Sequence, residues 1–232
     1  GQDTETITVD WGAAGSGGVT VVASNVCGAA DPETLPVSIY DVIISAQTGN
    51  WNVGTTWVGG VVPGTANSAV IDDGHTVTVT TNDDITNITI NPTATLNTQG
   101  FRFRIYGDYI LNGIHNSTTS DRVELRGLDS YIDGTGSFTG NRRMYIVSGN
   151  KIIAPTADLT LSNSLRINNN LIVTNQGQIS IGNEVWCNNN LSTWINAENS
   201  TLTVANRFFR GILQASAQGN TVSWNGGGNQ NI

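Results

Sequence analysis

Hydrophobic positions along this chain fall into short runs of three to five residues, in which apolar and polar side chains alternate. The runs are rich in Val, Ile and Thr and end at Gly, Asn or Asp, a pattern typical of half-buried β-strands. Asn and Thr make up about a quarter of the 232 residues, whereas the helix formers Leu, Lys and Glu are scarce. The pattern predicts an all-β protein without long helices.

An internal repeat of about twenty residues organises the chain from residue 43 onward. Segment 159–173 holds three strand-like runs and a row of three asparagines, and each of these recurs twenty residues later in segment 179–193. Three short strands per coil suit a three-sided parallel β-helix, because coils stacked at about 4.8 Å pair their strands with those above and below. We predict a right-handed parallel β-helix over residues 43–232, with about eight coils in a rod of roughly 40 Å that continues beyond the chain end.

The first 42 residues form a separate segment with three strand-like runs, at 7–11, 18–23 and 34–40. An immunoglobulin-type sandwich takes about seven strands, so three are too few to complete one. We therefore predict that residues 1–42 are the C-terminal part of a β-sandwich, that Gly1 is a cut end, and that Trp11 belongs to the sandwich core.

Two stretches resemble known families of surface proteins. Segment 10–12 (Asp-Trp-Gly), the Gly-rich hairpin 13–18 and segment 23–28 resemble the end of PKD-like, immunoglobulin-type modules in secreted Bacteroidota proteins. Segment 50–79, with Thr-Trp-Val-Gly-Gly-Val-Val-Pro at 56–63, resembles the opening of β-helix domains in surface proteins of the same bacteria and of the eight-glycine domain of animal surface proteins. The resemblance implies an extracellular or outer-surface location and a gliding- or adhesin-like cargo of type nine secretion.

The charge balance narrows the range of partners. Ten Lys and Arg oppose eighteen Asp and Glu, the net charge is −8, and Lys151 is the only lysine. We expect no basic stripe for a phosphate backbone, and therefore no nucleic-acid partner. No run approaches the ~18 apolar residues of a membrane span, so no membrane insertion is expected. The two cysteines, Cys27 and Cys187, are far apart in sequence, and their pairing stays open.

Alternating arginines and aromatics are the clearest candidates for ligand binding. Segments 101–106 and 207–210 place cations and aromatic rings on opposite faces of a regular strand. Guanidinium forks bind carboxylates and aromatic rings stack on sugars, so outward pairs would suit acidic polysaccharide or surface glycans. In the alternative interpretation, the aromatics fill the core and the arginines are simply solvated. The candidate ligand-binding residues are Arg102, Arg104, Arg126 and Arg166.

Metal and catalytic candidates are weaker. No cofactor is expected except, as an open alternative, a calcium ion at one of the acidic pairs, Asp72 with Asp73 or Asp83 with Asp84. Adjacent carboxylates in a strand point to opposite faces, so neither pair chelates alone. We assign no catalytic residue. An acidic-glycan lyase would need a cation and an arginine base, chosen from Arg102, Arg104, Arg126, Arg142, Arg143 and Arg166.

The remaining polar and aromatic motifs favour structural roles. We expect His75 to lie in a turn and His115 in a solvated loop. Trp51 and Trp57 are expected to cap the open end of the solenoid. The asparagine rows suit stacked side-chain ladders, with a glycan-facing row as the alternative.

These observations predict a non-catalytic surface protein of adhesin or stalk type, exported by a bacterial secretion system whose machinery is a further partner. A polysaccharide lyase or hydrolase acting on acidic glycans is the main alternative, and a passive cargo or filament subunit is another. Clustered Asp and Arg on one face would favour the enzyme, whereas a flat Thr/Asn face with scattered charges would favour the adhesin or stalk.

Overall fold

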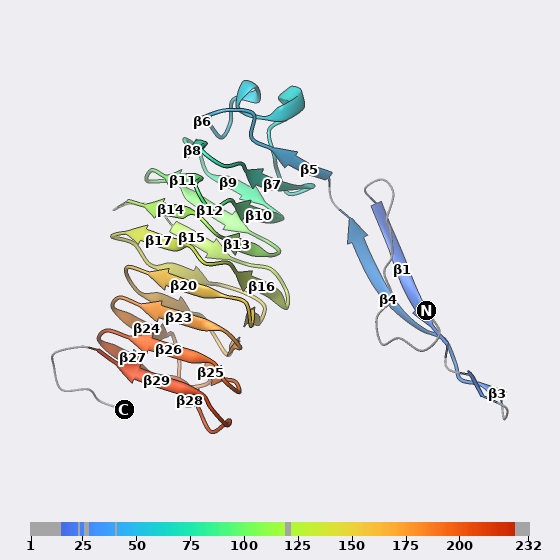
Figure 1. The fold of residues 1–232 in the computed structure, drawn as a ribbon, viewed down its shortest axis with the longest axis vertical. Helices are drawn as coiled ribbons and strands as arrows, with labels where there is room; N and C mark the ends of the chain where they lie inside the picture. The colour runs from blue at the N-terminus through green and yellow to red at the C-terminus, as the bar shows by residue number, and fades with distance from the viewer. Residues whose placement is uncertain (1–14, 23, 26–27, 40, 119–121, 226–232) are drawn as a thin grey trace. The chain divides into compact units, whose positions relative to one another are not determined.

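The computed structural model describes residues 15–22, 24–25, 28–39, 41–118 and 122–225 (Figure 1). The chain divides into two compact units, Gly1–Asp41 and Val42–Ile232. The helices of the described residues are two 3-10 turns of three residues each, η1 (Gly54–Thr56) and η2 (Val58–Gly60). Neither they nor any other described segment forms a helix long and apolar enough to cross a membrane.

The first unit contains two small antiparallel sheets within its described part. Strand β1 (Gly15–Val21) pairs with β4 (Glu33–Ile39), and β2 (Ser24–Asn25) pairs with β3 (Gly28–Ala29). The expected sandwich is not shown by these strands. The predicted strand at 7–11, with Trp11, and the cysteine at 27 lie outside the described residues.

The second unit is a parallel β-solenoid whose coils contribute to three sheets. Sheet 1 has nine strands: β5 (Asp41–Ile44), β7 (Asn67–Ile71), β10 (Asn87–Ile90), β13 (Tyr109–Leu111), β16 (Ser130–Asp133), β19 (Lys151–Ile153), β22 (Ile172–Asn175), β25 (Thr193–Asn196) and β28 (Ile212–Gln214). Sheet 2 has nine strands: β6 (Gly49–Asn50), β8 (Thr76–Val79), β11 (Thr95–Thr98), β14 (Ile114–Ser117), β17 (Ser137–Gly140), β20 (Asp158–Leu161), β23 (Gln178–Ile181), β26 (Thr201–Val204) and β29 (Thr221–Trp224). Sheet 3 has seven strands: β9 (Asp83–Ile85), β12 (Arg102–Ile105), β15 (Arg122–Leu125), β18 (Met144–Ile146), β21 (Leu165–Ile167), β24 (Glu184–Cys187) and β27 (Arg207–Phe209).

Strands β7 to β27 make seven complete coils of about 21 residues, each giving one strand to each sheet. The parallel solenoid is confirmed, but it has about seven turns where eight were predicted, because β5 and β6 are followed by η1 and η2. Paired residues are 19 to 23 positions apart, from Ala69 with Ile88 to Tyr109 with Ile132.

The repeat at 159–193 is correct in its first two strands and shifted in the third. Leu165 pairs with Val185, twenty positions away, but Val173 pairs with Trp194, twenty-one positions away. The predicted match of 171–173 with 191–193 is therefore wrong by one residue. The turn between β24 and β25 has five residues, whereas that between β21 and β22 has four.

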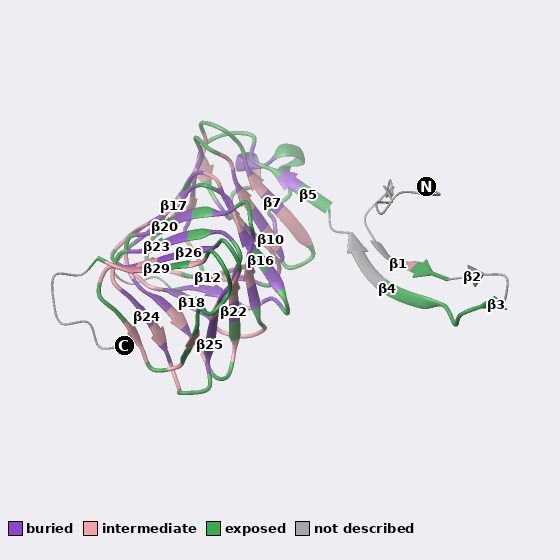
Figure 2. Cartoon of the chain, turned by 60° about the horizontal axis from the view of Figure 1, so that its bottom comes forward, coloured by how far each residue is buried: buried purple, intermediate pink, exposed green. Residues whose placement is uncertain are grey.

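The core runs through the inside of the solenoid, where alternate side chains of every strand are buried (Figure 2). In sheet 2, Val77, Leu96, His115, Phe138 and Leu161 stack in register, and each has at most 2% of its surface exposed. Burying one aliphatic side chain contributes about 1.5–3 kcal/mol. An isolated coil has no neighbour to cover its residues, so stability comes from stacking.

Two tryptophans close the N-terminal end of this core. Trp51 and Trp57 are buried, and their rings meet edge to face with centroids 4.9 Å apart. Trp51 also meets Phe103 of β12 at 4.9 Å, and Trp57 Nε1 donates a hydrogen bond of 2.7 Å to the Trp51 carbonyl. This placement agrees with the predicted capping role.

Asparagine ladders link adjacent coils. On the surface, Asn189 donates to the side-chain oxygen of Asn170 at 2.7 Å, and inside the solenoid Asn175 donates to Asn196 at 2.8 Å. Side chains that satisfy one another in this way stabilise stacked strands. The asparagine rows therefore contribute to the stacking of the coils.

His115 is buried, so its expected place in a solvated loop is wrong. Residues 114–117 form β14, and the register with β11 and β17 turns position 115 inward. The Tyr109 hydroxyl lies 2.8 Å from Nδ1, and the Phe138 ring meets the imidazole at 5.0 Å. Burial lowers the pKa of His115 from 6.5 to about 3, so the imidazole is neutral in the fold.

We predict that His115 makes the solenoid sensitive to acid. Between pH 3 and 6.5 the unfolded chain binds a proton that folded His115 excludes, so its contribution is complete above pH 6.5 and is lost as pH falls towards 3. The loss amounts to roughly 4 kcal/mol across that range. His115→Gln can keep a bond to Tyr109 and should show a flatter pH profile in urea unfolding at pH 7, 5 and 4. Equally steep profiles for both proteins would contradict this role.

Lys151 is a second buried ionisable residue, with 1% of its surface exposed. Its Nζ donates to the carbonyls of Gly127, Ser148, Gly149 and Asn150. An ammonium has three N–H donors and no acceptor, so these oxygens satisfy all of them. The lysine therefore gathers the backbone of two adjacent coils around one charge.

We expect Lys151→Met to lower the free energy of unfolding by about 2–4 kcal/mol, because methionine has a similar length but leaves buried carbonyls unpaired. Urea unfolding at pH 7 would measure the difference. An unchanged midpoint would show that these carbonyls have other partners.

Candidate functional site

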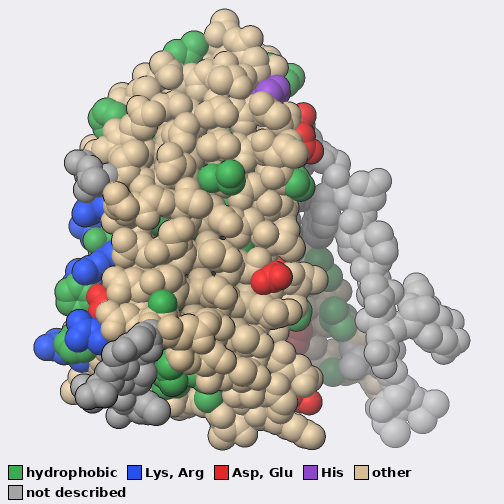
Figure 3. Space-filling model, turned by 60° about the vertical axis from the view of Figure 1, so that its left-hand side comes forward, with side chains coloured by type: hydrophobic (Ala, Val, Ile, Leu, Met, Phe, Trp, Pro, Cys, Tyr) green, Lys and Arg blue, Asp and Glu red, His purple; other side chains and the backbone are tan. Residues whose placement is uncertain are grey.

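All nine arginines of the chain lie on sheet 3 or in the turns next to its strands. Five arginines belong to β12, β15, β21 and β27, and the other four lie within three residues of β15, β18 or β27. They are Arg102, Arg104, Arg122, Arg126, Arg142, Arg143, Arg166, Arg207 and Arg210. The expectation of no basic stripe is therefore wrong, because the coil period gathers arginines that are scattered in sequence. Figure 3 shows basic side chains along one margin of a largely uncharged face.

The outer face of sheet 2 contrasts with sheet 3. Its strands carry one charged residue, Asp158, besides the buried His115. A column of mainly hydroxyl side chains follows the register of eight strands: Thr76, Thr95, Ile114, Ser137, Thr160, Ser180, Thr203 and Ser223. Charges on the solenoid are thus segregated by face, which neither of the two expected patterns fully describes.

Seven outward positions of sheet 3 form a continuous column, one from each coil. Register places each directly beside the next along the solenoid. We call these residues the charged column: Asp84, Arg104, Glu124, Tyr145, Arg166, Trp186 and Phe209. The spacing of 20, 20, 21, 21, 20 and 23 residues follows the coil length.

Arginines stack on the aromatic rings of the charged column. The Arg166 guanidinium lies 5.8 Å from the Tyr145 ring centroid and 4.7 Å from that of Trp186. Arg122 covers Tyr145 at 4.9 Å, and Arg143 covers Trp186 at 4.4 Å. Each such contact contributes about 0.5–2 kcal/mol, with the larger values where water is excluded. The aromatics of the column therefore face outward beneath arginines and do not fill the core.

Two glutamates lie beneath pairs of arginines. Glu124 Oε1 is 2.5 Å from Arg122 Nε and Glu124 Oε2 is 2.6 Å from Arg126 Nε; the glutamate side chain is 1% exposed, against 48% and 30% for the arginines. We call this arrangement the first clamp.

The second clamp has the same design. Glu184 Oε2 lies 2.9 Å from Arg207 Nε, and Oε1 lies 3.7 Å from an amino group of Arg143. Each clamp joins two cations to one carboxylate and keeps one net positive charge. The buried glutamates hold guanidinium groups that remain partly open to solvent.

The acidic pairs do not form metal sites in the described residues, where no group of three or more His, Cys, Asp and Glu side chains is placed to hold an ion. Asp83 and Asp84 align with the inward Phe103 and the outward Arg104, so the predicted opposition of neighbouring carboxylates is confirmed. Asp84 Oδ1 lies 2.6 Å from Arg104 Nε. Burial raises the pKa of Asp83.

Asp72 and Asp73 lie in the turn between β7 and β8, where they bind the next coil. Asp72 Oδ1 accepts a bond from Asn91, and Asp73 Oδ1 accepts bonds from the backbone and hydroxyl of Thr93. These bonds to Thr93 lower the pKa of Asp73. In the same turn His75 Nδ1 lies 2.8 Å from Ser45 Oγ, as expected for a turn residue.

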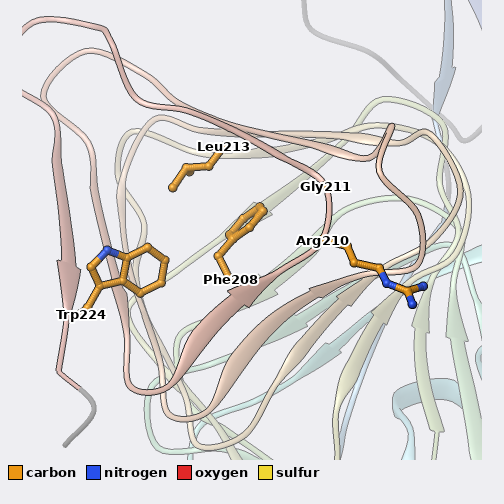
Figure 4. A pocket seen from close by; sticks show the side chains of 5 residues that line it. All are labelled: Phe208, Arg210, Gly211, Leu213 and Trp224. Carbon is orange, nitrogen blue, oxygen red and sulfur yellow. The ribbon is translucent and has the colours of Figure 1, made fainter. Parts of the chain in front are cut away.

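The cysteine and the cavity at the C-terminal end offer no catalytic group. Cys187 is buried and free, and burial raises the pKa of its thiol to about 12, so it is not a thiolate. Beyond it, Phe208, Leu213 and Trp224 point towards one another around a cavity of about 320 Å³, while the Arg210 side chain points away (Figure 4). This apolar space is the open end of the core.

The structure brings the four predicted arginines onto one sheet and adds residues that the sequence did not indicate. Arg104 and Arg166 belong to the charged column, Arg126 to the first clamp, and Arg102 lies beside Arg122 one coil earlier. The missed residues are Arg122, Glu124, Arg143, Tyr145, Glu184, Trp186, Arg207 and Phe209. Extending the 20-residue repeat backward from Trp186 would have connected most of them.

Comparison with protein-family models, curated proteins and solved structures gives no match to this chain. The fold defines the second unit as a parallel β-solenoid, and the chemistry of its sheet 3 is the basis for assigning a function.

We predict that the first clamp is energetically coupled. Arg122→Ala or Arg126→Ala alone should cost at most about 1 kcal/mol, because Glu124 keeps one partner and the arginines are solvated. The double variant leaves the buried glutamate unpaired and should cost about 3 kcal/mol. Urea unfolding of the four proteins gives the coupling, with the exposed Arg102→Ala as a near-neutral control. Additive effects would show that Glu124 does not depend on the pair.

Proposed function

We propose that this chain belongs to a non-catalytic, exported surface protein of adhesin type whose charged column and clamps bind acidic polysaccharide. The observation that carries the proposal is the gathering of all nine arginines on one sheet of an acidic protein, interleaved with outward aromatic rings. In this proposal the solenoid is right-handed, the first unit is the end of a PKD-like spacer, and the protein acts outside the cell after type nine secretion.

The chemistry of sheet 3 fits carboxylated sugars. A planar guanidinium offers five N–H donors that match a carboxylate in pairs. Arg122, Arg126 and Arg207 spend Nε on a glutamate, which leaves four further N–H groups on each for other acceptors. Tyr145 and Trp186 supply rings for stacking against a sugar.

A lyase or hydrolase is the second candidate, because acidic and basic residues do share one face. The carboxylates of this face, however, are each held by arginines: Asp84 by Arg104, and the two clamp glutamates by two arginines each. A hydrolase needs carboxylates that reach the glycosidic bond. The pairing favours binding over cleavage.

We expect the purified chain to be retarded in gels containing polygalacturonate or alginate, and not in gels containing a neutral glucan. Arg166→Ala should weaken the retardation about tenfold, equivalent to about 1.4 kcal/mol, because it removes the cation between two rings. Thr160→Ala, on the outer face of sheet 2, is the matched control. Runs with calcium and with chelator test the open question of a calcium ion.

Three outcomes would overturn the proposal. New unsaturated or reducing ends that vanish in Arg104→Ala or Arg126→Ala would identify an enzyme. Absence of retardation in every acidic gel would leave a stalk or an export cargo. Equal competition by single-stranded DNA would indicate a general polyanion surface.

A further inference from the structure

We infer that the charged column binds an acidic oligosaccharide lengthwise, parallel to the solenoid axis, and grips it at the two clamps. This inference rests on the proposed function and adds the direction, the minimum length and the two anchor points of the ligand.

The clamps are separated by a fixed number of coils. Glu124 is on β15 and Glu184 on β24, and β18 and β21 lie between them in sheet 3. Three steps of about 4.8 Å place the clamps about 14 Å apart along the axis. Hydrogen-bonded stacking fixes this separation, so both anchors are preorganised.

The coils between the clamps carry the stacking residues. Tyr145 and Arg166 occupy the two intermediate positions of the charged column, and Trp186 shares a strand with Glu184. Arg143 joins the two parts, because it covers the Trp186 ring and contacts the second glutamate. The described surface between the anchors is therefore continuous in cations and rings.

Two N–H groups in this stretch lack an acceptor. Arg166 Nε and Trp186 Nε1 are buried without a hydrogen-bond partner, although they are neighbours in register. An unpaired buried donor costs about 1–3 kcal/mol. A carboxylate or hydroxyl oxygen of a bound sugar could accept these bonds if the Arg143 guanidinium moved off the Trp186 ring. The centre of the column is thus polar, unsatisfied and flanked by positive charge.

The periodicity of the surface favours a lengthwise ligand. One pyranose ring in an extended chain is about as long as one coil step, so a chain along the axis meets a new cation or ring at every sugar. A chain laid along one strand would meet the side chains of a single coil. Contact with both clamps spans four coils, which sets a minimum of about four sugar residues.

Calorimetry with galacturonate oligomers of two to eight residues tests this inference. Two weak anchor sites on one ligand bind with an increased effective concentration once the ligand spans both. We expect affinity to rise at least tenfold between the trimer and the pentamer and then to change little per added residue. A smooth rise in affinity with length would overturn the two-anchor arrangement.

A clamp variant provides the second readout. Arg122→Gln/Glu124→Gln/Arg126→Gln removes the first clamp without leaving a buried unpaired charge, and circular dichroism would verify its fold. It should reduce hexamer affinity to that of the trimer and leave dimer affinity within twofold. Arg102→Gln removes the same net charge one coil outside the span and should cost the hexamer no more than threefold; an equal loss would overturn the inference. Retardation by polymer without a length step refutes the lengthwise grip alone, whereas no binding at any length refutes the proposed function.

Discussion

The in-register hydrogen bonding of one coil to the next is the constraint on which the rest of this structure depends. It places each residue beside the residue 19 to 23 positions earlier, both inside the solenoid and on its surface. The same rule that stacks Leu96 on Val77 in the core aligns Arg104 with Asp84 and Trp186 with Arg166 outside. A chemical property repeated at the coil period therefore becomes a continuous line on one face.

The class of fold followed from sequence because it depends on two periods that are visible in the chain. Alternation with period two gives strands, and repetition near twenty residues gives coils. The turns were harder to predict, since one additional residue between β24 and β25 changes the register without changing the polarity of the strands. His115 was misjudged for a related reason: polar neighbours suggested a loop, whereas its direction is set by strands β11 and β17.

The site was only partly predictable for the same physical reason. Arg102 and Arg104 stand out because they alternate with phenylalanine in one strand. Glu124 and Glu184 look unremarkable in their own strands, and their roles arise only when residues 20 or more positions away join them. Net charge misled in the same way, since a total of −8 describes the whole chain and conceals a face where arginines outnumber carboxylates.

Variation in turn length has a consequence for how such a surface changes over generations. Coils of 19 to 23 residues keep the strands in register, so the turns absorb insertions that would otherwise displace the outer columns. The natural unit of change is then a whole coil, gained or lost by duplication or deletion. Each event would lengthen or shorten the line of arginines and rings by one step, like adding or removing a graduation on a molecular ruler.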